Sequence, residues 1–135
     1  MDTAIEERFV RQFCRKRIRE RLLFELGSPN KRKAAMSRFS HNYADILIEE
    51  YRNELNKHDV HATWIIGQLK KLGAAESVYC LSYLEGIDGR SLGLDEAVRL
   101  VYGAGMPSII VCGSSLAYFE AEQSAGAPPR FILKR

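Results

Sequence analysis

The chain has 135 residues, of which 46% are hydrophobic and 27% are charged. This is an ordinary globular composition, and a chain of this length can bury about two-thirds of its surface without disulfides or metals. No apolar run reaches the roughly 20 residues that a membrane-spanning helix needs, and the first residues lack the apolar stretch of a secretory signal. The sequence therefore predicts a cytoplasmic protein with no membrane partner.

The net charge of +3 is unevenly distributed along the chain. Residues 1–42 contain eleven Lys and Arg against five Asp and Glu, which gives +6. Residues 43–76 contain four against six, for −2, and residues 77–135 contain five against six, for −1. A basic block of this kind attracts a polyanion or an acidic protein surface.

The first half of the chain is predicted to be helical. Apolar residues recur at helical spacing over 4–26, and Gly27 is suited to end that helix. Ser28-Pro29 then forms an N-cap and first-turn pair that predicts the start of a second helix. A third helix is expected over 43–56, and a fourth over 59–72, where a glycine follows.

The second half has the pattern of strands. Short β-rich runs bounded by turn residues predict strands at 78–84, 108–112, 116–122 and 130–134. A short helix is expected between the first two, with Leu94, Ala97, Val98 and Val101 on its buried side. The passage from the first strand through this helix to the second fits a parallel, right-handed crossover.

The last two strands predict their own pairing. When Glu122 lies opposite Arg130, one face holds only apolar residues, namely Ala117, Phe119, Ala121, Phe131 and Leu133. We therefore expect an antiparallel hairpin with this face buried.

Together these elements predict an α+β fold. About four helices in residues 1–73 would pack on a small, mostly antiparallel sheet of about four strands in residues 77–135, which also carries one further helix. The helices are expected to cover one face of the sheet, and one domain is expected to span residues 1–135.

Basic residues provide the candidate binding site. Four arginines spaced three or four residues apart are expected to form a stripe along the first helix, and the next helix continues the basic surface. The predicted site consists of Arg8, Arg11, Arg15, Arg19, Lys31, Arg32, Lys33 and Arg38. The alternative is a solvated helix face, because acidic residues four positions away neutralise part of the charge.

Histidines and cysteines offer weaker signals. His58 and His61 form an H-x-x-H, which on a helix could provide two metal ligands, but no Cys or Glu has the usual partner spacing. Cys14, Cys80 and Cys112 are odd in number and widely separated, so neither a disulfide nor a zinc site is predicted. Cys80 and Cys112 are expected in the core, and the arginines near Cys14 could lower its pKa.

Two carboxylates on one strand form the last candidate. Glu120 and Glu122 point the same way, and such a pair can perform acid–base chemistry or bind magnesium. The favoured alternative is a solvent-facing pair opposite Arg130 and Lys134. Asp88-Gly89 is expected to form a turn.

No motif points to a particular protein family. We interpret the chain as a non-enzymatic protein-interaction or regulatory domain with a basic N-terminal helical surface, no cofactor, and a partner that is another protein or a polyanion. The first alternative is an RNA- or DNA-binding protein, which the absence of an aromatic stacking motif weakens. The second is an enzyme, whose pocket would need polar groups that only the fold brings together.

Overall fold

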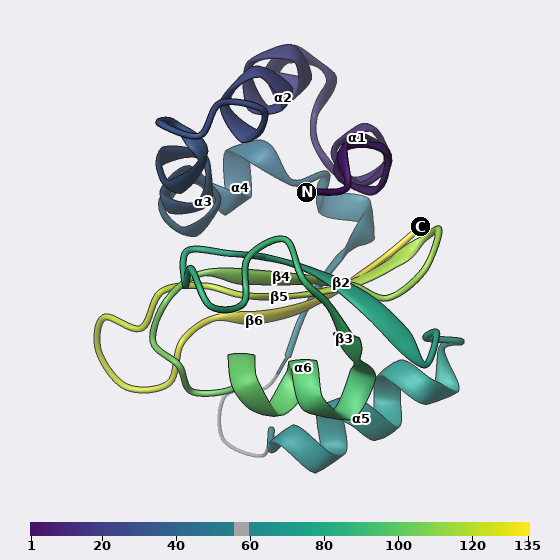
Figure 1. Ribbon diagram of the computed structural model, residues 1–135. Helices are drawn as coiled ribbons and strands as arrows, with labels where there is room; N and C mark the ends of the chain where they lie inside the picture. The colour runs from purple at the N-terminus through teal and green to yellow at the C-terminus, as the bar shows by residue number, and fades with distance from the viewer. Residues whose placement is uncertain (56–59) are drawn as a thin grey trace.

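In the computed structural model, residues 1–55 and 60–135 are described. Within them, six strands form one antiparallel sheet in the order β1-β6-β5-β4-β2-β3, which runs through the middle of Figure 1. The strands are β1 (Arg52–Glu54), β2 (Ser77–Ser82), β3 (Ser91–Gly93), β4 (Ser108–Val111), β5 (Leu116–Glu120) and β6 (Arg130–Lys134).

Helices lie on both faces of the sheet (Figure 1). One face carries α1 (Thr3–Phe13), the 3-10 turn η1 (Lys16–Ile18), α2 (Arg19–Leu26), α3 (Arg32–His41), α4 (Tyr43–Ile46) and the 3-10 turn η2 (Glu49–Tyr51). The other face carries α5 (Ala62–Lys71) and α6 (Leu94–Val101). The α+β class is confirmed, but the expectation that helices cover one face is wrong.

Alternation along the central strands explains the two helical layers. Phe131 and Leu133 belong to the core under α1–α4, whereas Ile132 between them belongs to the core against α5 and α6. All five residues of β5 are buried. Because both faces of a strand are apolar, each face needs a covering layer.

The predicted helix over 4–26 is interrupted. α1 ends at Phe13, and Cys14 is extended and forms an isolated antiparallel bridge with Leu47. The Phe13 carbonyl accepts a hydrogen bond from the Ile48 amide at 2.9 Å, and the Arg15 amide donates to the Ile46 carbonyl at 2.8 Å. This long-range pairing replaces the helical hydrogen bonds that the local periodicity predicted.

The predicted helix over 43–56 is also wrong for residues 43–55, and its last residue lies outside the described residues. It is replaced by the four-residue α4, by η2, and by β1, which pairs with β6. The Leu55 amide donates to the Arg130 carbonyl at 2.8 Å, so the sheet supplies the partners that a helix would have used. A strand from the helical half therefore completes the sheet.

The other helix boundaries shift by a few residues. The Ser28 carbonyl accepts from the amides of Lys31 and Arg32, so residues 28–31 form a turn and α3 begins only at Arg32. α5 corresponds to the predicted helix over 59–72, whose first residue lies outside the described residues. Gly73 follows it with a φ of 97°, the left-handed conformation expected of a glycine that ends a helix.

The hairpin of β5 and β6 forms with a register two residues away from the prediction. Glu120, rather than Glu122, lies opposite Arg130. Because side chains alternate with a period of two, this slip keeps the predicted faces, and Phe119 and Phe131 are buried as expected. The Glu122 amide instead donates to the Ser40 hydroxyl at 2.8 Å, outside the strand.

The predicted parallel crossover is wrong. β2 pairs with β4 in antiparallel fashion, from Tyr79 opposite Val111 to Ser82 opposite Ser108. The three-residue strand β3, which the sequence analysis missed, reverses the chain beside β2 before α6 begins. No helix of the described residues combines the length and apolar character that crossing a bilayer requires.

Candidate functional site

Arg32, one of the eight predicted site residues, is buried. It is 7% exposed and forms ion pairs with Glu6 and Asp88, both at 2.6 Å. It also donates to the Leu26 carbonyl at 3.0 Å. Burial alone would lower the pKa of Arg32, but the hydrogen bonds that its guanidinium donates to the two carboxylates outweigh burial and raise the pKa. Arg32 is therefore not part of an exposed basic surface.

The carboxylates around Arg32 are themselves fully engaged. Tyr79 donates its hydroxyl to Glu6 at 2.5 Å, and the Ser82 amide donates to Asp88 at 3.0 Å. Burial and the hydrogen bond to Glu6 raise the pKa of Tyr79 to about 12. This cluster joins α1, α3, β2 and the turn before β3, where Gly89 has the positive φ of 75° that the predicted turn requires.

Three other predicted residues form ion pairs: those of Arg11 and Lys33 are exposed, whereas Arg38 pairs with the buried Glu25. Arg11 lies 2.8 Å from Glu7, Lys33 lies 2.9 Å from Glu85, and Arg38 lies 2.8 Å from Glu25. Arg11 also lies 3.7 Å from Glu20. These acidic neighbours reduce the positive field of the helices, as the solvated-face alternative supposes.

The remaining four predicted residues have no carboxylate within 4.0 Å in the described part of the chain. Arg19 donates to the Cys14 carbonyl at 2.9 Å, and Arg15 reaches the Ala44 carbonyl at 3.4 Å. Arg19 therefore contacts backbone at the break between α1 and η1, and Arg15 contacts backbone in α4. Arg8 and Lys31 are exposed. Because α1 ends at Phe13 and Arg32 is buried, the eight residues do not form one continuous stripe.

A smaller basic surface gathers around α2. η1 leads directly into α2, so Arg17, Arg21 and Phe24 follow one another at helical spacings of four and three. Phe24 is 63% exposed, and the ammonium of Lys31 lies 4.9 Å from the centre of its ring. We call these four residues the α2 patch. In Figure 1, α2 lies farther from the sheet than α1 and α3 do.

The sequence analysis missed Phe24, although a signal was present. The apolar steps of the predicted first helix run through Leu22 and Leu26, which are 0% and 4% exposed. Phe24 falls between these steps, so helical geometry places it on another side of the helix.

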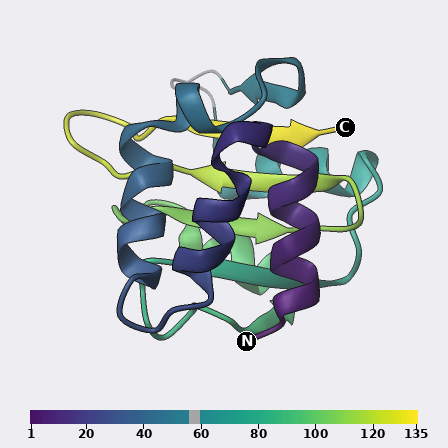
Figure 2. The same cartoon turned by 90° about the horizontal axis from the view of Figure 1, so that it is seen from above.

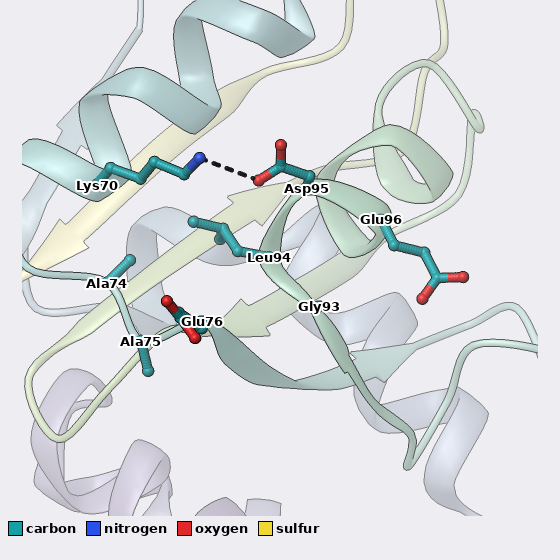
Figure 3. Close-up of a pocket in the computed structure, with 8 residues that line it drawn as sticks. All are labelled: Lys70, Ala74, Ala75, Glu76, Gly93, Leu94, Asp95 and Glu96. Carbon is teal, nitrogen blue, oxygen red and sulfur yellow. Dashed lines mark ion pairs between the residues drawn. The ribbon is translucent and has the colours of Figure 1, made fainter.

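A hollow lies at the other end of the molecule, where α5, the start of β2 and the start of α6 meet (Figure 3). Its volume is about 710 Å³. Lys70 and Asp95 form an ion pair across it at 3.4 Å, and the Leu94 side chain lies next to this pair (Figure 3). Glu76 and Glu96 add two carboxylates, so the lining is acidic. Because Lys70 and Asp95 are more than half exposed, their pairing is weak.

The predicted carboxylate pair is separated by the fold. Glu120 is 0% exposed and accepts hydrogen bonds from Arg130 at 2.8 Å, Tyr118 at 2.7 Å and the Gly103 amide at 2.9 Å. Burial, with the nearby Glu120 charge, raises the pKa of Tyr118. The expected solvent-facing pair is therefore wrong for Glu120, whose oxygens hold the loop after α6 against the sheet.

Glu122 instead lies beside a histidine. His41 Nε2 is 3.3 Å from Glu122 Oε2, at a hollow of about 120 Å³ that Ser37 and Tyr83 also line. The His41 side chain is 63% exposed and that of Glu122 is 39% exposed. This pair lies in solvent, with no enclosure that would strengthen its electrostatics.

The remaining candidates do not converge. His58 lies outside the described residues, and His61 is exposed at the residue before α5. Burial raises the pKa of Cys14, so the expected lowering by nearby arginines is wrong, and burial raises that of Cys80 to about 11 and that of Cys112 to about 12. Among residues 1–55 and 60–135, no three His, Cys, Asp or Glu side chains are grouped so that they could hold a metal ion.

The fold and its surface define an α+β protein with an antiparallel sheet between two helical layers and an exposed aromatic residue among cations on its outermost helix. The chain matches no family model, no curated protein and no solved structure.

Proposed function

We propose that the protein is a non-enzymatic binding module that docks on an acidic surface of a partner protein through the α2 patch. The observation that carries this proposal is the 63% exposure of Phe24 on the outermost helix, with Lys31 over its ring and with Arg21 and Arg17 at helical spacing before it. Aromatic and arginine side chains are the residues most enriched at the centres of protein interfaces.

Phe24 is not needed to attach α2 to the core. Leu22 and Leu26 are buried and already anchor the helix. Fully burying a phenylalanine side chain is worth roughly 1.5–3 kcal/mol, and none of the fold's own elements provides that burial for Phe24. A partner that covers the ring would gain this free energy.

The charges around Phe24 select the chemistry of that partner. Arg17 and Lys31 have no carboxylate within 4.0 Å in the described part of the chain. Arg21 comes no closer than 3.8 Å to the buried Glu25, so that ion pair is long. Glu20, the nearest exposed carboxylate along α2, contacts Arg11 instead. Complementary potentials steer association, so an acidic surface would bind faster and with more selectivity than a neutral one.

A protein partner fits these residues better than a nucleic acid. Tracking a phosphate backbone needs several adjacent free cations, but Arg32 is buried, and Arg11, Lys33 and Arg38 are paired with carboxylates. One exposed aromatic ring is also short of the successive stacking platforms of single-strand binders.

The test is a capture experiment from native lysate, with and without nuclease, using the wild-type protein, Phe24→Ala and Leu100→Ala. Leu100 is a matched control, because it is 45% exposed and lies on α6 in the opposite layer. We expect the wild type and Leu100→Ala to retain the same protein, and Phe24→Ala to lose it, whether or not nuclease is present. Release by nuclease would favour the nucleic-acid alternative, and equal capture by Phe24→Ala would refute the α2 patch.

A further inference from the structure

A second hollow, of about 230 Å³, lies on the α1 side of the sheet edge. α1, β2, β3 and the turn between β4 and β5 surround it. Its polar lining consists of Arg8, Ser77, Tyr79, Ser91 and Ser114. None of its ten lining residues is an aspartate or glutamate, so its only formal charge is the guanidinium of Arg8.

Apart from Tyr79, the polar side chains of this hollow form no hydrogen bond or ion pair in the described part of the chain. Arg8 forms no ion pair in the described part of the chain, in contrast to Arg32 on α3 of the same helical layer. Within the same residues, the hydroxyls of Ser77, Ser91 and Ser114 have no hydrogen-bond partner. The backbone amides of Gly113 and Ser114 likewise have no backbone acceptor there. Tyr79 differs, because its hydroxyl is bound to Glu6.

The lining also has an apolar part. Ile5 stands one helical turn before Arg8 on α1, and Val111 lies on β4, so aliphatic groups adjoin the cation and the hydroxyls. The space is smaller than the roughly 300–1,000 Å³ of sites for drug-sized ligands. It suits a compact molecule that has a charged head and a few carbon atoms.

We propose that this hollow binds a small organic anion, with its phosphate or carboxylate head on Arg8. A guanidinium donates two parallel hydrogen bonds to either oxyanion, and serine hydroxyls and free amides can satisfy the remaining oxygens. The apolar part of the ligand packs against Ile5 and Val111. This site is separate from the α2 patch and does not depend on the proposed function.

The experiment is a titration of the ¹⁵N-labelled protein, followed by amide chemical shifts. The probes are phenyl phosphate, benzoate and inorganic phosphate, and the variants are Arg8→Gln and Arg8→Lys, with Arg99→Gln as control. Arg99 is an exposed arginine of α6 that does not line this hollow, so the control removes the same charge elsewhere.

We expect phenyl phosphate or benzoate to shift the amides of Ser77, Ser91 and Ser114. Losing charge-assisted hydrogen bonds should weaken binding about tenfold or more in Arg8→Gln, less in Arg8→Lys, and not in Arg99→Gln. The organic probe that binds more tightly shows whether the hollow prefers a phosphate or a carboxylate head. Inorganic phosphate measures the affinity of the phosphate head without an apolar part. The absence of shifts at these amides with all three probes, or equal binding by Arg8→Gln, would overturn the proposal.

Discussion

The two faces of the sheet are packed with different chemistry. Under α1–α4 the core is rich in aromatic side chains, and Phe119 and Phe131 stack with their ring centres 5.8 Å apart. Against α5 and α6 the core is aliphatic, apart from Tyr118 beside the buried Glu120. Figure 2, which looks down on the α1–α4 layer, shows α1, α2 and α3 side by side across the strands.

The two faces of the sheet also differ in where their buried charges lie. On the α1–α4 side, Arg32 joins helices to a turn at the rim of the aromatic core. On the α5–α6 side, Glu120 and Arg130 lie opposite each other within the sheet. In the described residues, no buried side-chain nitrogen or oxygen lacks a hydrogen-bond partner. Both networks are therefore complete, which is the condition under which buried charges are tolerated.

Arg32→Ala should give the largest effect, about 5 kcal/mol of lost stability, at the top of the range for breaking a buried ion pair. Two carboxylates, Glu6 and Asp88, would lose their common partner. Urea denaturation measures the change. Lys33→Ala is the control, because its ion pair with Glu85 is exposed and should contribute far less to stability. Equal effects of the two substitutions would contradict this role of Arg32.

Phe131→Ala should cost about 4 kcal/mol, within the usual range for emptying an aromatic core site. Ile132→Val, on the opposite face, should cost about 0.5–1.5 kcal/mol. Phe24→Ala should change stability by no more than about 0.5 kcal/mol, because that ring is exposed. Thermal melts of the three variants measure this order. A Phe131→Ala melt identical to wild type would show that the aromatic face is not packed as described.

Tyr79 should make stability depend on pH above the neutral range. Its pKa is about 12 in the folded protein and about 10 in an unfolded chain, because burial and the hydrogen bond to Glu6 favour the neutral phenol. The contribution is complete below pH 10 and is lost as the pH rises toward 12, because the unfolded chain ionises first. Its size should be no more than about 2–3 kcal/mol.

Denaturation of the wild type and of Tyr79→Phe between pH 9 and pH 12 tests whether ionisation of Tyr79 lowers the stability of the fold. We expect the wild type to lose more stability than the variant over that interval, since the variant has no phenol to ionise. A parallel decline in the two proteins would show that Tyr79 does not contribute.

Local sequence patterns predicted the elements whose hydrogen bonds are local, together with one hairpin. α6 has its four predicted residues buried, and the hairpin of β5 and β6 keeps its predicted faces. The failures share a cause. Residues 13–15 and 52–54 satisfy their backbone through distant partners, at Leu47 and in β6, which helical periodicity cannot report.

The candidate site was less predictable than the fold. Lys31, Arg32 and Lys33 are adjacent in sequence, yet one contacts an aromatic ring, one is buried between two carboxylates, and one has an exposed partner. Glu120 was expected in solvent because the second helical layer was not foreseen. Which charges remain available depends on the acidic residues that the fold brings to them.

Lys70→Ala should have the smallest effect, about 0.2–1 kcal/mol. The ion pair with Asp95 spans the hollow of about 710 Å³, but the two side chains are 59% and 58% exposed, and water screens such pairs. The same loss should shrink further in about 1 M salt, where the Debye length is roughly 3 Å. Arg130→Ala, in the buried network of the same face, provides the contrast, with an expected loss of about 3–5 kcal/mol that salt does not remove. Denaturation at low and high salt compares the two variants. If Lys70→Ala cost as much as Arg130→Ala, the exposed ion pair in Figure 3 would stabilise the α5–α6 layer as strongly as the buried network does.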